Sequence, residues 1–178
     1  TAEEFCSGSK VSFQALYIFG QKNLGKTHLL LSIGNLTAKN GSRAVYIQGS
    51  DFANKMGHGK SLEAQKTLDQ LLDVDFFLMD NVEGIAHSST AQEKLYHIYN
   101  QITEKGGKLA FTSSFPPDKN SVMESYLTSR FQWGMVAEIK PIDDATTAKI
   151  IVKLAMDISL IMPEPIIHFL LSRIPRDF

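Results

Sequence analysis

The sequence predicts an α/β protein in which a central parallel β-sheet carries helices on both faces. Five short apolar or β-branched runs alternate with segments of helical periodicity, which favours parallel strands joined by helices. These runs cover residues 16–19, 44–48, 75–79, 109–112 and 135–139. Apolar residues are continuous over 76–79, as is typical of a strand buried on both faces. We therefore expect that run to lie in the interior of the sheet.

Helices are predicted between and after these runs. Apolar residues recur at helical spacing in the segments 28–36, 61–72, 90–104, 121–131 and 143–159, and a further helix is expected to start near Pro163. The first of these helices should end near Asn40 and Gly41. The last two follow the final strand and predict the beginning of a small helical lid. We accordingly divide the chain into a core at 1–140 and a partial lid at 141–178.

Length and composition restrict the possible functions. A chain of 178 residues with 43% hydrophobic and 21% charged residues is typical of a globular domain, and no apolar stretch approaches a membrane span. A net charge of −1 lacks the basic excess of autonomous duplex-DNA binders, so weak or no duplex binding is expected. The single Cys6 favours a reducing compartment and argues against a structural zinc site.

The most specific motif lies between the first run and the first helix. Residues 20–27 match the phosphate-binding pattern G-x-x-x-x-G-K-[ST]. Its glycines allow a tight turn whose N–H groups point at a phosphate from a helix N-terminus. Lys26 is predicted to reach the β- and γ-phosphates and Thr27 to ligate Mg²⁺. The predicted nucleotide-binding residues are Gly20, Gln21, Lys22, Asn23, Leu24, Gly25, Lys26, Thr27 and His28.

The second part of the predicted site follows the third run. Asp80 comes directly after the apolar strand, which is the arrangement of a Walker B carboxylate that binds Mg²⁺. Asn81 stands where hydrolysing proteins of this class commonly carry an acid, and an amide cannot accept a proton from water. We therefore expect slow intrinsic hydrolysis. Glu83 could replace the missing acid, but an exposed loop glutamate without a catalytic role is the simpler interpretation.

The fourth run ends in three small hydroxyl residues, Thr112, Ser113 and Ser114. Their place at the end of a neighbouring strand would allow them to sense the γ-phosphate. Serine and threonine at strand ends are also common as turn residues, so both interpretations stay open.

Four segments in a fixed order resemble one known family. They are G-x-x-x-x-G-K-T-H-L-L from residue 20, the pair Asp80-Asn81, T-S-x-x-P-P from Thr112, and S-R-F-Q-W-G at 129–134. From about residue 16 to 178 the chain resembles the AAA+ ATPase domain of the bacterial replication initiator DnaA and its regulatory relative Hda. The resemblance implies a three-layer P-loop AAA+ fold that binds ATP or ADP with Mg²⁺.

The resemblance also implies roles for individual residues. Lys26, Asp80, Asn81 and Arg130 occupy the catalytic positions, and Thr27 and Asp80 the metal positions. Arg130 lies in the arginine-finger region, where it would act in trans on nucleotide bound by an adjacent subunit. The expected partners are DnaA-family AAA+ subunits or further copies of this chain. An Hda-like role adds the replication clamp, although no clamp-binding peptide is recognisable at 1–10.

The leading hypothesis is a bacterial cytoplasmic AAA+ module with weak ATPase activity that acts in the initiation or regulation of chromosome replication. Asn81 is closer to the Hda pattern than to that of DnaA, and Ser114 replaces a common acid. A helicase-loader-type AAA+ protein and a non-hydrolysing nucleotide-binding module are the alternatives. A small-molecule P-loop kinase is disfavoured because no acceptor site accompanies the loop.

Overall fold

The computed structural model describes residues 2–7, 13–57, 62–120 and 122–173. The chain forms two compact units. The first unit comprises Thr1–Gln21 and Gly25–Ile139, and the second comprises Lys22–Leu24 and Lys140–Phe178.

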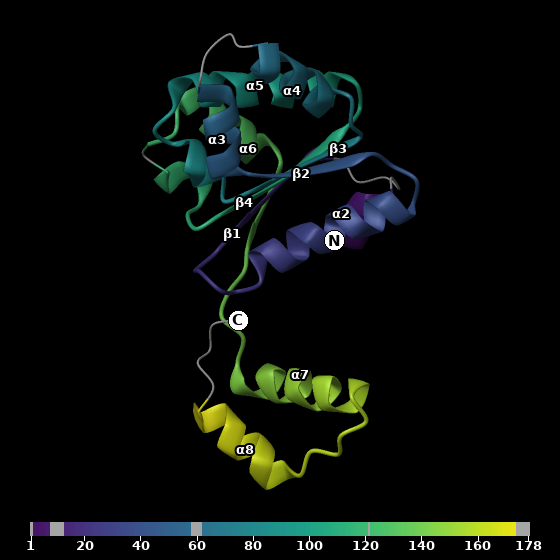
Figure 1. Cartoon of the computed structure of the whole chain (residues 1–178). Helices are drawn as coiled ribbons and strands as arrows, with labels where there is room; N and C mark the ends of the chain where they lie inside the picture. The colour runs from purple at the N-terminus through teal and green to yellow at the C-terminus, as the bar shows by residue number, and fades with distance from the viewer. Residues whose placement is uncertain (1, 8–12, 58–61, 121, 174–178) are drawn as a thin grey trace. The chain divides into compact units, whose positions relative to one another are not determined.

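A five-stranded parallel sheet forms the centre of the first unit, which confirms the predicted α/β class (Figure 1). The strand order is β2-β3-β4-β1-β5. The strands are β1 (Ala15–Phe19), β2 (Ala44–Gln48), β3 (Phe76–Asp80), β4 (Lys108–Ser113) and β5 (Met135–Glu138). All five residues of β3 are buried, and β3 lies between β2 and β4, so the continuous apolar run is an interior strand as predicted.

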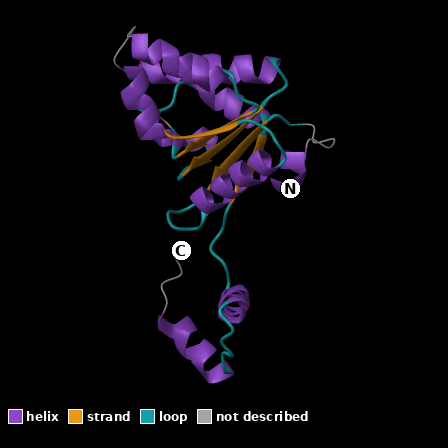
Figure 2. Ribbon diagram, turned by 45° about the vertical axis from the view of Figure 1, so that its right-hand side comes forward, coloured by secondary structure: helices purple, strands orange, loops and turns teal. Residues whose placement is uncertain are grey.

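Helices cover both faces of the sheet and complete three layers, as Figure 2 shows. One face carries α1 (Ala2–Ser7) and α2 (Lys26–Lys39), whose apolar residues pack with Leu16 and Ile18 of β1. The other face carries α3 (Gly49–Gly57), α4 (Leu62–Leu72), α5 (Ser89–Glu104) and α6 (Ser125–Trp133). Neighbouring residues of β1 therefore point to opposite cores, as the period of two in a strand requires.

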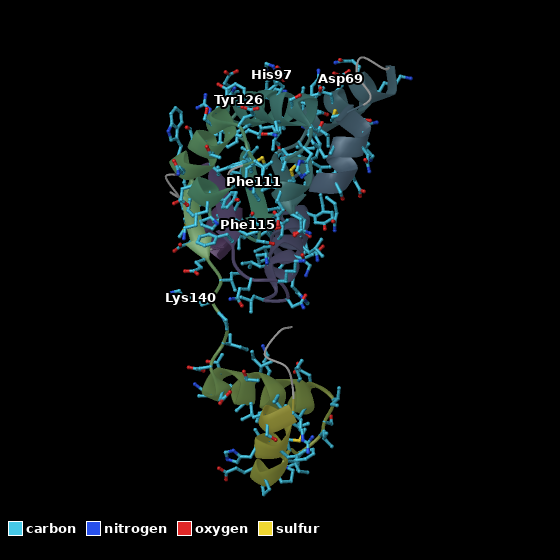
Figure 3. The ribbon with its side chains drawn as sticks, turned by 90° about the vertical axis from the view of Figure 1, so that its left-hand side faces the viewer. Asp69, His97, Phe111, Phe115, Tyr126 and Lys140 are labelled. Atoms are coloured by element: carbon cyan, nitrogen blue, oxygen red, sulfur yellow. The ribbon has the colours of Figure 1, made fainter. Side chains whose placement is uncertain are left out.

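Aromatic side chains dominate the larger core. The ring of Phe131 lies 5.1 Å from that of Tyr17 and 4.8 Å from that of Phe111, and all three side chains are at most 1% exposed. Figure 3 shows Phe111 inside the first unit. These contacts fix α6 against β1 and β4.

Two helices are not predicted by the sequence, and one starts later than expected. The missed helices are α1 and α3. Helix α3 has only nine residues and begins directly after β2, and its two buried apolar residues, Phe52 and Met56, are too few to show a helical period. The predicted helix at 121–131 begins at Ser125 instead. Short 3₁₀ helices, η1 (Val82–Ile85) and η2 (Pro117–Lys119), follow β3 and β4.

The second unit contains α7 (Asp144–Asp157) and α8 (Glu164–Arg173). The side chain of Asp143 caps α7, because its Oδ1 accepts the backbone N–H of Thr146 at 2.7 Å. Within the described residues, no helix combines the length and the apolar character needed to cross a membrane.

Candidate functional site at the carboxyl edge of the sheet

The predicted phosphate-binding loop connects β1 to α2. Gly25 is the N-cap residue of α2 and has a left-handed conformation (φ 83°), which glycine adopts without steric cost. Asn23 is also left-handed, with φ 62°. The loop thus brings the N-terminus of α2, where backbone N–H groups lack helical partners, to the edge where the parallel strands end.

Lys26 is buried at the start of α2, with only 6% of its surface exposed. Its Nζ donates hydrogen bonds to the backbone oxygens of Gly20 at 2.9 Å and Gln21 at 2.6 Å. Burial lowers the pKa of Lys26, while the negative charges of Glu83 and Asp80 act in the opposite direction. A buried cation held only by neutral carbonyls suits a site that receives an anion.

Asp80 is held in a fixed orientation at the end of β3, with 1% of its surface exposed. Its Oδ2 accepts hydrogen bonds from the hydroxyls of Thr27 at 2.8 Å and Tyr46 at 3.0 Å. Its Oδ1 accepts the hydroxyl of Thr112. Thr27 and Asp80 are therefore in direct contact, and Lys26 is the residue before Thr27 at the start of α2.

Sequence reasoning missed Tyr46, although a signal existed. In β2, Tyr46 lies two residues before Gln48, which pairs with Asp80 in register, so its side chain emerges on the same face of the sheet as Asp80. Burial raises the pKa of the Tyr46 hydroxyl, and the Asp80 charge raises it further. Tyr46 stays protonated and donates a hydrogen bond to the carboxylate of Asp80.

The donor set at Thr27 and Asp80 fits Mg²⁺. A hydroxyl and a carboxylate are hard oxygen ligands, and Mg²⁺ is usually bound by one or two carboxylates together with substrate phosphates and water. Among the residues that the structure describes, no group of three or more His, Cys, Asp or Glu side chains could hold a metal ion. Metal binding here would therefore depend on phosphate oxygens as well.

The hydroxyl residues at the end of β4 have structural partners. Thr112 donates to Asp80, and its Oγ1 accepts the backbone N–H of Asn81 at 2.8 Å. The Oγ of Ser113 accepts the N–H of Phe115 at 3.1 Å, which is the turn role that the sequence left open. Asn81 is left-handed, with φ 51° and ψ 61°, a conformation that Asn tolerates better than most residues.

Glu83 is not in an exposed loop, so the position that the sequence suggested for it is wrong. It lies in η1 and is half-buried, and its Oε1 accepts the backbone N–H of Ser114 at 3.0 Å. Its Oε2 is buried without a hydrogen-bond partner. The sequence could not reveal this, because nothing in it shows that η1 folds back over the end of β4.

Arg130 does not join the cluster around Asp80. Its guanidinium carbon lies 4.4 Å from the ring centroid of Trp133, 5.5 Å from that of Tyr96 and 5.9 Å from that of Tyr99. Side-chain hydrogen bonds with Arg130 and, to a smaller extent, Asn100 lower the pKa of Tyr96. Trp133 is 72% exposed, whereas Arg130 itself is half-buried between α5 and Trp133. Five of the other predicted site residues are exposed: Gln21, Lys22, Asn23, Thr27 and His28.

The strand order, the loop before α2 and the carboxylate at the end of β3 define an AAA+ P-loop ATPase domain. Residues 1–138 match the family model of the bacterial DnaA ATPase domain. The chain therefore belongs to the family of bacterial DnaA ATPase domains.

Individual relatives agree with this assignment. The chromosomal replication initiator protein DnaA of Caldanaerobacter subterraneus subsp. tengcongensis is 30% identical over 166 residues, which cover 92% of this chain and 38% of that protein. The AMPPCP-bound DnaA of Aquifex aeolicus has a TM-score of 0.89 at 28% identity, covering 98% of this chain and 55% of that one. Domain III of Thermotoga maritima DnaA has a TM-score of 0.82 at 32% identity, covering 96% of this chain and 72% of that one.

Proposed function

We propose that this chain is a nucleotide-controlled assembly ATPase that takes part in initiating or regulating bacterial chromosome replication. The observation that carries the proposal is the cluster of Lys26, Thr27 and Asp80 at the carboxyl edge of the sheet. A lysine, a hydroxyl and a carboxylate in this arrangement are the parts that bind a nucleoside triphosphate with its metal ion.

The nucleotide is ATP or ADP. The N–H groups at the start of α2 would surround the phosphates, and Lys26 would exchange its bonds to Gly20 and Gln21 for phosphate oxygens. The Aquifex relative carries AMPPCP, an ATP analogue, which supports an adenine nucleotide. Thr27 and Asp80 would hold Mg²⁺, which supplies positive charge next to the phosphates.

Hydrolysis is expected to be slow, so the nucleotide acts more as a switch than as a fuel. Asn81 offers an amide at the position that often carries an acid, and loss of a general base costs about 10²- to 10⁴-fold in rate. A bound triphosphate would then persist long enough to determine which subunits assemble.

Arg130 is the residue that would reach a neighbouring subunit. It is half-buried among aromatic side chains of α5 and α6, next to the exposed Trp133, rather than at the nucleotide cluster of its own chain. An arginine placed in this way can stabilise transition-state charge on nucleotide bound elsewhere. The partners are DnaA-family AAA+ subunits or further copies of this chain in the bacterial cytoplasm, and the replication clamp if the role is Hda-like.

The experiment that tests the proposal is calorimetric titration of Lys26→Ala with ATP and ADP in the presence of Mg²⁺. Removing the charged partner of the phosphates should weaken binding by at least about 10²-fold. Lys39→Ala, at the exposed end of the same helix, is the control and should bind like the parent. Unchanged affinity in Lys26→Ala would exclude nucleotide binding at this loop.

A further inference from the structure

We propose that Glu83 is the general base of the slow ATP hydrolysis at this site and compensates only in part for the carboxylate that Asn81 lacks. This inference rests on the proposed function, because it assigns a catalytic role at the same nucleotide site. It depends on three observations: a carboxylate oxygen without a partner, a rigid support, and a position next to the phosphate loop.

The first observation is the unpartnered oxygen. Oε1 of Glu83 accepts the N–H of Ser114 at 3.0 Å, whereas Oε2 is buried and has no hydrogen-bond partner. A buried carboxylate oxygen without a donor is costly and rare in native proteins. A water molecule that donates a hydrogen bond to Oε2 would satisfy it. A general base removes the proton of a water through the same kind of hydrogen bond.

The second observation is the rigid support of η1. Residues three apart in a 3₁₀ helix lie above one another, and Val82 and Ile85 are both fully buried in the larger core. Gly84 approaches α3 so closely that a Cβ atom there would lie 2.5 Å from the backbone nitrogen of Ser50. Glu83 therefore extends from a segment that is fixed on both sides, as pre-organisation of a catalytic group requires.

The third observation is the position of the carboxylate. Glu83 follows β3, and its bond to Ser114 places it over the end of β4, the next strand in the sheet. Beyond β4 lies β1, and Gly20 at the start of the phosphate loop donates its N–H to the oxygen of Ser113 at 3.3 Å. Oε1 is thus fixed one residue away from the point where β4 contacts the loop.

The proposed step is a single displacement. A water oxygen bonds to the γ-phosphorus while Oε2 of Glu83 takes one proton from that water. The bond between the γ-phosphorus and the bridging oxygen breaks, and its electron pair stays on ADP, next to Lys26. The products are ADP and inorganic phosphate, and Glu83 returns its proton to phosphate or solvent.

A purely structural role for Glu83 makes a different prediction. If the side chain served only to hold the N–H of Ser114, an amide oxygen would do the same, and Glu83→Gln would behave like the parent. If Glu83 is the base, the Glu83→Gln variant should bind nucleotide but lose ATP turnover. It should also favour ATP over ADP, because a negative charge next to the γ-phosphate has been removed.

The test uses the full chain and two measurements. Single-turnover hydrolysis of radiolabelled ATP should fall by at least about 10²-fold in Glu83→Gln. The ratio of the ATP and ADP affinities, from competition against a fluorescent nucleotide, should shift about fivefold toward ATP. Glu93→Gln, which neutralises an exposed glutamate of α5, is the control and should change neither quantity.

The outcomes separate the inference from the proposed function. A parent that binds no nucleotide would contradict the proposed function. A parent that binds nucleotide but hydrolyses ATP no faster than buffer, or a Glu83→Gln variant with parental turnover, would overturn the role of Glu83 alone. Lost turnover with a parental affinity ratio would also overturn it, because the charge would then not face the γ-phosphate.

Discussion

Replacing Gly84 by alanine should destabilise the first unit, because η1 has no room for a side chain on the side that faces α3. An ideal Cβ at Gly84 would lie 2.5 Å from the nitrogen of Ser50, 2.8 Å from the carbonyl carbon of Gly49 and 3.2 Å from its Cα. These are backbone atoms of a helix that begins directly after β2, so no side-chain rotation can relieve the overlap.

The magnitude follows from the cost of overpacking. Added methyl or methylene groups in a well-packed region cost about 1–3 kcal/mol, and two contacts below 3.0 Å with backbone place Gly84→Ala in the upper part of that range. We expect the free energy of unfolding to fall by about 2–3 kcal/mol and the melting temperature by about 5–10 °C.

Urea denaturation followed by tryptophan fluorescence measures this loss in the first unit. Trp133 is the single tryptophan of the chain and ends α6. The control is Gly57→Ala in α3, where the added Cβ would meet only the Oγ of Ser88 at an ordinary 3.7 Å. Alanine is the better helix former, so the control should be neutral or slightly stabilising. Equal stability of Gly84→Ala and Gly57→Ala would refute the close approach of η1 and α3.

Two further predictions concern Arg130 and Tyr17. Arg130→Ala should keep nucleotide affinity within about twofold, but its stimulation of a DnaA-family partner's ATPase should fall by about 10³-fold or more. The control is Arg43→Ala, which removes a surface ion pair with Asp73. Full stimulation by Arg130→Ala would contradict the trans role. Burial raises the pKa of Tyr17 to about 12, so the folded chain keeps a proton that the unfolded chain loses near pH 10. The free energy of unfolding should therefore fall by up to about 2–3 kcal/mol as the pH rises from 10 to 12. Urea denaturation across this range should show a smaller fall in Tyr17→Phe, and equal falls in both proteins would contradict the burial of the hydroxyl.

The fold could be predicted from the sequence where an apolar pattern extends over a long segment, or where a segment is buried on all sides. The strand at 76–79 is continuously apolar because both faces of β3 are covered, and the helix after the phosphate loop has a clear apolar stripe. In contrast, α3 has only nine residues and too few apolar positions to show a period. The start of α6 was misplaced by four residues, since Ser125 rather than Ser121 begins the helix.

The site could be predicted only in part, for a different reason. The residues Lys26, Thr27 and Asp80 belong to motifs whose spacing is fixed by the chemistry of phosphate and metal binding. Tyr46 and Glu83 reach the same edge through strand register and through the fold of η1, neither of which is encoded in a local motif. The sequence showed that Glu83 was close in number to Asp80, but its burial and its bond to Ser114 exist only in three dimensions.

The orientation of Asp80 shows how directly the site depends on the sheet. Three hydroxyl groups hold this carboxylate: Tyr46 from β2, Thr112 from β4 and Thr27 from α2. Only an interior strand has a neighbour on each side, so a carboxylate at the end of β3 can be held from both directions. A slip of one residue in either pairing would turn the hydroxyl of that neighbour to the opposite face. The buried apolar residues of β3 that fix the register therefore also fix the geometry of the proposed metal site.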